Sequence, residues 1–137
     1  MMPRNHRKFM RVNIGSTTSM GLLDPTGIAD RTLDVTLVNL SAGGAQIVAN
    51  ESILTSQPIR LGVKSADPPL EMNVIGRVIR ADMKAADGTF RCGIKFSTMS
   101  DADRVTLTRF VLRLALKTGQ GADRIVRDPA PVASGVV

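Results

Sequence analysis

The residues best suited to bind a ligand begin with two arginines near the start of the chain. Arg7 and Arg11 are four positions apart in a basic leader, residues 1–11, that contains no acidic residue. Positions spaced by four share a face in an extended chain and also on a helix, so we expect both guanidinium groups to point the same way. A guanidinium group makes bidentate contacts to phosphate or to guanine O6 and N7. Taken alone, the pair is equally consistent with a solvated basic tail.

A second polar group closes the most regular alternating segment of the sequence. Residues 33–38 alternate apolar and polar side chains, which predicts a half-buried strand, and Asn39 and Ser41 follow it directly. The Asn39 amide offers a donor and an acceptor to a base edge, and the Ser41 hydroxyl can donate to a phosphate or ribose oxygen. Gly43 and Gly44 come next, and glycine lets a backbone turn tightly or approach a ligand. A hairpin turn that binds nothing is the alternative for this segment.

The two groups together indicate a purine nucleotide with more than one phosphate charge. If the leader folds onto the end of the strand, five residues would surround such a ligand: Arg7, Arg11, Asn39, Ser41 and Gly44. Each good bidentate contact to a base contributes roughly 1–3 kcal/mol of discrimination. Additional contacts are expected from His6, Lys8 and Gly43.

Composition limits the class of protein. The 137 residues predict one domain with a real core, and the net charge of +6 indicates an anionic partner. No apolar run approaches the ~20 residues of a membrane span, and the basic start lacks the apolar region of a signal peptide. The single cysteine, Cys92, suits a reducing compartment, so we expect a cytoplasmic protein.

Several functional classes lack the residues that they need. His6 is the only histidine, and no Gly-x-Ser-x-Gly motif surrounds Ser41, which argues against a catalytic triad. A lone Cys92 in an alternating segment is better interpreted as a small core residue than as a metal ligand. No phosphate-binding Gly-x-x-x-x-Gly-Lys-Ser/Thr loop is present. We therefore expect neither an enzyme nor a protein that needs a metal or cofactor.

Short strands separated by turn residues fill most of the chain and predict a small barrel or sandwich. The expected strands are residues 12–14, 32–40, 45–48, 59–64, 70–80 and 90–96. Turns are expected at residues 24–27, 67–69 and 86–88, and a change in the phase of the alternation predicts a bulge at Gly76.

The periodicity then changes to that of a helix, which Ser100 can cap and Gly119 would end. Its apolar stripe consists of Leu107, Phe110, Val111 and Leu114. Further apolar residues widen this stripe beyond one face: Val105, Leu112, Ala115 and Leu116. The wide face suits barrel packing, and it also suits a homodimer through the helix. The tail, residues 119–137, has no periodicity and is expected to be disordered.

In the order of these two polar groups the chain resembles the PilZ domain family, the bacterial receptor module for cyclic di-GMP. Arg7-Lys8-Phe9-Met10-Arg11 matches the family's Arg-x-x-x-Arg motif, and Asn39-Leu40-Ser41-Ala42-Gly43-Gly44 matches its Asp/Asn-x-Ser-x-x-Gly motif about thirty residues later. The resemblance continues through residues 92–96 and the helix, and so covers about residues 4–117. Either motif alone is common by chance, whereas both in this order in a β-rich chain are specific.

The resemblance implies an all-β fold: a six-stranded antiparallel barrel with one C-terminal helix and a flexible basic leader. The PilZ domain would span residues 1–118, with the leader at 1–11, the helix at 100–118 and the tail at 119–137. Arg7 and Arg11 would hold guanine and phosphate groups, and Asn39, Ser41 and Gly44 would contact the other guanine edge. The leader would become ordered when the ligand binds.

The function implied is a cyclic di-GMP receptor that signals to an unidentified protein partner in motility or exopolysaccharide control. The family often has arginine or an apolar residue where this chain has His6, so binding of one or of two ligand molecules is open. One alternative is a small basic barrel that binds RNA or DNA non-specifically, although four phenylalanines without tyrosine or tryptophan offer few stacking platforms. Another is a degenerate PilZ domain that binds only proteins.

Overall fold

The computed structural model describes residues 10–81 and 85–119, so His6, Arg7 and Lys8 of the leader and the tail from residue 120 lie outside the described residues. The described chain forms six strands and one helix: β1 (Arg11–Leu23), β2 (Ala29–Ser41), β3 (Gly44–Ala49), β4 (Pro58–Ala66), β5 (Pro69–Ala81), β6 (Phe90–Thr98) and α1 (Asp101–Thr118).

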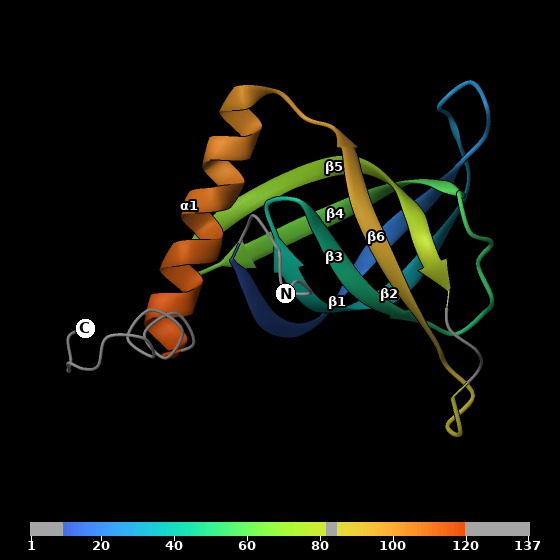
Figure 1. Ribbon diagram of the computed structural model, residues 1–137, viewed down its shortest axis with the longest axis horizontal. Helices are drawn as coiled ribbons and strands as arrows, with labels where there is room; N and C mark the ends of the chain where they lie inside the picture. The colour runs from blue at the N-terminus through green and yellow to red at the C-terminus, as the bar shows by residue number, and fades with distance from the viewer. Residues whose placement is uncertain (1–9, 82–84, 120–137) are drawn as a thin grey trace, which may run out of the picture.

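The six strands close into a barrel in the order β1-β2-β3-β6-β5-β4, and each neighbouring pair is antiparallel (Figure 1). Pairing of β1 with β4 completes the ring, which leaves no open sheet edge. The expected six-stranded antiparallel barrel with a C-terminal helix is therefore confirmed.

The strand β1 is much longer than the expected strand at residues 12–14. The pairing of β1 with β2 shifts by one residue between Asn13 and Ser16, and Gly15 in this interval has a φ of 79°. Beyond this bulge the side chains of Ser16 and Thr17 are exposed. The apolar–polar alternation that marks a strand in the sequence is therefore interrupted, although the backbone pairing continues.

The predicted turns and the Gly76 bulge are present. Asp24 Oδ1 accepts hydrogen bonds from the backbone N–H groups of Thr26 and Ile28 at 2.8 and 3.0 Å, which closes the turn between β1 and β2. The register of β5 with β6 shifts between Ile75 and Gly76. A Cβ atom at Gly76 would lie 2.5 Å from the Lys95 backbone oxygen, so the close approach of these strands requires glycine.

The helix α1 lies at one end of the barrel (Figure 1). Its buried residues Leu107, Phe110 and Val111 belong to the same core as the barrel interior, which also contains Cys92 at 1% exposure. Ser100 Oγ accepts a hydrogen bond from the Asp103 backbone N–H at 3.1 Å, and the chain leaves the helix at Gly119 with a φ of 84°. Both predicted ends of the helix are confirmed.

Candidate ligand site on the outer face of the barrel

A bulge in β2 places Asn39 on the outer face of the barrel. Leu37 pairs with Ile47 of β3, and both side chains are buried in the barrel interior. Strict alternation would put Asn39 on the same inner face as Leu37. The register shifts by one residue at Val38, so that Asn39 pairs with Gln46 on the opposite, outer face.

A second bulge, in β5, places Arg80 on the outer face of the barrel. Val78 pairs with Ile94 of β6, and both side chains are buried. The register then shifts by one residue at Ile79, and Arg80 pairs with Gly93. The Arg80 side chain therefore leaves the barrel on its outer face.

These shifts align one row of residues across four strands. Gln46 of β3 pairs with Gly93 of β6, so Asn39, Gln46, Gly93 and Arg80 follow one another across β2, β3, β6 and β5. The row borders a hollow of about 310 Å³, at the lower end of the range for small-molecule sites. The described residues that line this outer-face hollow are Arg11, Asn39, Ala45, Gln46, Ile79, Arg80, Gly93 and Ile94.

Gly93 forms an open floor in the outer-face hollow. A Cβ atom built at Gly93 would lie 3.7 Å from Arg80 Cβ, which is an ordinary van der Waals contact. Packing of the strands therefore tolerates a side chain at this position, unlike the position of Gly76. The absence of a side chain at Gly93 leaves room above the sheet for a ligand.

A chain of hydrogen bonds orients the polar side chains of the outer-face hollow. Arg11 Nη1 donates to Asn39 Oδ1 at 2.7 Å, and Asn39 Nδ2 donates to Gln46 Oε1 at 2.8 Å. Because a guanidinium group can only donate, it fixes the Asn39 oxygen toward Arg11 and the Asn39 nitrogen toward Gln46. The eight lining residues include two arginines and no carboxylate. The outer-face hollow is therefore suited to an anionic ligand with many acceptors.

Ser41, Gly43 and Gly44 form the turn beside this hollow and are not among its lining residues. Ser41 Oγ is buried and accepts hydrogen bonds from the backbone N–H groups of Gly43 and Gly44, both at 3.2 Å. A Cβ atom on Gly44 would collide with the Ile94 backbone oxygen. Both residues thus shape the turn, and their contact with a ligand stays a prediction.

The structure brings together two of the five predicted site residues, Arg11 and Asn39. Sequence reasoning missed Gln46, Gly93 and Arg80 as members of the same site. Each stands in a segment that was expected to be a strand, but its neighbours in sequence give no sign of a ligand. The signal lies in the pairing of four strands, which a single sequence does not display.

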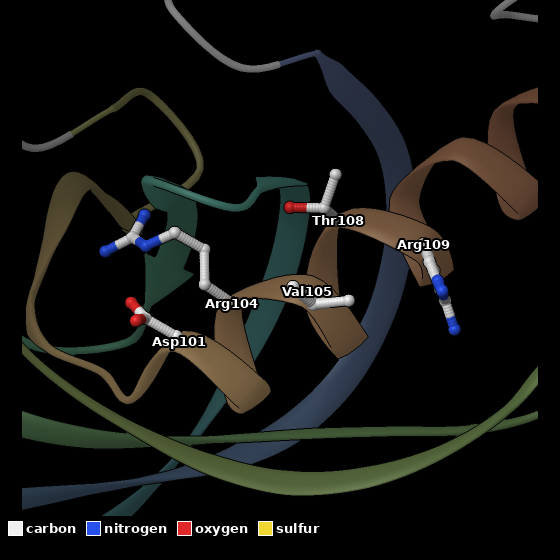
Figure 2. A pocket seen from close by; sticks show the side chains of 5 residues that line it. All are labelled: Asp101, Arg104, Val105, Thr108 and Arg109. Atoms are coloured by element: carbon white, nitrogen blue, oxygen red, sulfur yellow. The ribbon is translucent and has the colours of Figure 1, made fainter.

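A second hollow, of about 480 Å³, lies along α1 (Figure 2). Its described lining consists of Asp101, Arg104, Val105, Thr108 and Arg109, and it contains none of the predicted site residues. Arg104 is directed toward the turn between β2 and β3, where its Nη1 donates to the Ala42 oxygen at 3.1 Å. The outer-face hollow remains the candidate site, because it combines both motifs with a lining free of carboxylates.

Residues 10–81 and 85–119 contain no group of three or more His, Cys, Asp or Glu side chains that could hold a metal ion. In this same part of the chain, no helix is long and apolar enough to cross a membrane.

Three solved structures share this fold at low sequence identity. The Bacillus subtilis inhibitor of motility, MotI/DgrA, has a TM-score of 0.66 and 16% identity over 85% of this chain and 57% of its own. The PilZ domain of YcgR from Escherichia coli with c-di-GMP has a TM-score of 0.61 and 16% identity over 87% and 98%. The K. pneumonia MrkH–c-di-GMP complex has a TM-score of 0.64 and 13% identity over 85% and 55%.

This chain therefore spans just over half the length of MotI/DgrA and of MrkH and nearly all of the YcgR domain. No curated protein sequence matches it. The family model that describes the PilZ domain matches residues 5–113, a range that begins in the basic leader and ends within α1. With both motifs inside that match and the barrel formed as expected, the chain belongs to the PilZ domain family.

Proposed function

We propose that this protein is a cyclic di-GMP receptor that passes the signal to a protein partner and catalyses no reaction. The observation that carries the proposal is the 2.7 Å hydrogen bond from Arg11 Nη1 to Asn39 Oδ1. It joins the second arginine of the first motif to the first residue of the second motif, in a hollow that also contains Arg80. Two of the similar proteins, the YcgR PilZ domain and MrkH, form complexes with c-di-GMP in their solved structures.

Each group of the outer-face hollow has a role in this proposal. The guanidinium groups of Arg11 and Arg80 donate to guanine O6 and N7 or to phosphate oxygens, as such forks do elsewhere. The Asn39 and Gln46 amides contact the base edge. The open floor at Gly93 lets a flat ring lie close to the sheet.

The remaining motif residues complete the binding site in the proposal. Ser41, Gly43 and Gly44 supply the edge of the site on the side of the turn, and Arg7 reaches the ligand from the leader. His6 and Lys8 add contacts, and His6 bears on whether one or two ligand molecules bind. The ligand is the only small molecule required, without metal or cofactor.

The signal would leave the site through the leader and through α1. Ordering of the leader on binding changes the surface that a partner meets. The Arg104–Ala42 hydrogen bond connects α1 to the turn that carries Ser41, so a shift of the turn would also move the helix. The partner is a protein of motility or exopolysaccharide control. A cytoplasmic location is part of the proposal, because the only cysteine, Cys92, is a free thiol.

A homodimer through α1 is a further element of the proposal. Val105, Leu112 and Leu116 are 51%, 41% and 50% exposed. Their spacing of seven and four residues places them on one side of the helix, opposite the buried stripe. A second copy of the chain would cover these aliphatic side chains.

Isothermal titration calorimetry with cyclic di-GMP, GMP and GTP tests the receptor function. We expect selective binding of cyclic di-GMP, with a loss of at least tenfold in affinity in Arg7→Ala and in Arg11→Ala. Lys64→Ala is the matched control, because Lys64 is exposed on β4 and pairs with Glu71 outside the outer-face hollow. Binding of any RNA or DNA with a steep salt dependence, and no heat with the nucleotide, would favour the polynucleotide alternative instead.

A further inference from the structure

Two basic side chains oppose each other on the outer face of the barrel. Arg77 of β5 pairs directly with Lys95 of β6, and both are exposed. Like charges that face each other across two strands destabilise a sheet. On the neighbouring pair of strands, by contrast, Lys64 of β4 faces an acidic partner, Glu71 of β5, at 3.8 Å. Within the described part of the chain, neither Arg77 nor Lys95 forms an ion pair.

The Arg77–Lys95 pair forms a second row beside the outer-face hollow. Lys95 is two residues from Gly93 along β6, so it shares the outer face at about 7 Å from the floor of the hollow. On its other side Lys95 pairs with Gly44, the first residue of β3. The second row therefore runs past the turn that carries the Asp/Asn-x-Ser-x-x-Gly motif, and neither basic residue lines the hollow itself.

We propose that Arg77 and Lys95 form a second anion subsite, which holds the second phosphate of a cyclic dinucleotide whose first half occupies the outer-face hollow. This inference rests on the proposed function. The volume of about 310 Å³ lies at the low end for a whole ligand, so part of a dinucleotide extends over the neighbouring surface. A phosphate between Arg77 and Lys95 would replace their mutual repulsion by two charge-assisted contacts.

The opposite side of the outer-face hollow is a weaker candidate for the subsite of the second phosphate. There the neighbouring row pairs Val48 of β3 with Arg91 of β6. The pKa of Asp87 is lowered mainly by a hydrogen bond from the Thr89 side chain, and the charge of nearby Arg91 makes a smaller contribution, so Arg91 has an acidic neighbour. The side with two basic residues and without an acidic neighbour is therefore favoured for a phosphate.

Calorimetry with two ligands separates the subsite from the rest of the site. Cyclic di-GMP has two phosphates, whereas the linear dinucleotide GpG has two guanines and one phosphate. We expect Arg77→Gln and Lys95→Gln each to weaken cyclic di-GMP binding about tenfold and to leave GpG binding unchanged. Lys64→Gln, which removes an exposed lysine elsewhere on the barrel, should bind both ligands as the unchanged chain does.

A charge reversal distinguishes ligand binding from damage to the fold. Arg77→Glu creates an opposite-charge pair with Lys95, so its melting temperature should equal or exceed that of the unchanged chain. Its affinity for cyclic di-GMP should nevertheless fall by at least as much as in Arg77→Gln.

Three results would overturn the inference. If the unchanged chain binds cyclic di-GMP and Arg11→Ala does not, but Arg77→Gln and Lys95→Gln bind normally, the subsite is refuted while the receptor function stands. If both variants weaken GpG as much as cyclic di-GMP, the effect is general electrostatic attraction. If the unchanged chain does not bind cyclic di-GMP, the subsite fails together with the proposed function.

Discussion

Arg11 and Asn39 are 28 residues apart in sequence, yet the Arg11 guanidinium donates a 2.7 Å hydrogen bond to the Asn39 amide oxygen across β1 and β2. The same amide donates from its nitrogen to Gln46 on β3 at 2.8 Å. Three neighbouring strands thus contribute one oriented polar chain to the outer-face hollow. Because the arginine can only donate, it sets the direction of the whole chain.

We first predict that Arg11→Ala and Asn39→Ala are strongly non-additive in their effects on cyclic di-GMP affinity. Each single substitution should cost at least tenfold, and the double variant should lose little more, because either change already breaks the same hydrogen-bonded unit. Calorimetry on the four proteins of this double-mutant cycle measures the coupling. Fully additive losses would show that the two side chains act on the ligand independently.

Substitution of Gly93 should separate binding from folding. In Gly93→Val the side chain rises from the floor of the outer-face hollow, where an added Cβ makes only ordinary contacts with Ile79 and Arg80. We expect a melting temperature within a few degrees of the unchanged chain and a loss of cyclic di-GMP affinity of at least tenfold. Normal affinity in this variant would place the ligand elsewhere on the molecule.

Gly44→Ala should destabilise the fold. Its added methyl group would collide with the Ile94 backbone oxygen, so β3 and β6 must move apart. Overpacking of this kind typically costs about 1–3 kcal/mol, which urea denaturation measures. A fully stable Gly44→Ala variant would contradict the assignment of this glycine to strand packing.

The loop closed by Asp24 should make stability depend on pH. The pKa of Asp24 lies below its ordinary value of 3.8, mainly because its carboxylate accepts a hydrogen bond from the Thr26 side chain and a second from the Ile28 backbone. A lowered pKa in the folded state stabilises the protein above the ordinary pKa, and this contribution is lost as the pH falls through the lowered value. Melting temperatures recorded across this range test the expectation.

The matched variant for that titration is Asp24→Asn, which keeps an acceptor oxygen but cannot ionise. It should melt below the unchanged chain at neutral pH, and the difference should shrink as the solution becomes more acidic than the ordinary pKa of 3.8. A difference that stays constant with pH would mean that the charge of Asp24 contributes nothing.

The exposed aliphatic side of α1 predicts self-association. Light scattering after size exclusion should give a dimer for the unchanged chain and a monomer for Leu112→Glu, because a charge at the centre of an apolar contact is costly to bury. Thr106→Glu is the control, since Thr106 is exposed on the same helix away from Val105, Leu112 and Leu116. A monomer for the unchanged chain at all concentrations would refute the dimer.

Much of the fold could be predicted from local patterns in the sequence. Ser100 and Gly119 marked the two ends of α1 because capping depends only on nearby backbone groups. Asp24 and Gly88 marked turns for the same reason, and Cys92 was correctly interpreted as a core residue. The long β1 was missed beyond residue 14, since the bulge around Gly15 breaks the alternation on which the prediction depended.

Likewise, some residues of the candidate site could be predicted from the sequence, and others could be found only in the tertiary structure. The sequence by itself determined which motif residues to examine, and Arg11 and Asn39 do meet in the outer-face hollow. Only the tertiary structure decided which face of the barrel carries them, because the bulge at Val38 reverses the alternation that residues 33–38 display. Only the structure also added Gly93 and Arg80, through strand register and the bulge at Ile79. Register is a property of two paired strands and depends on residues distant in the chain, so no single segment contains it.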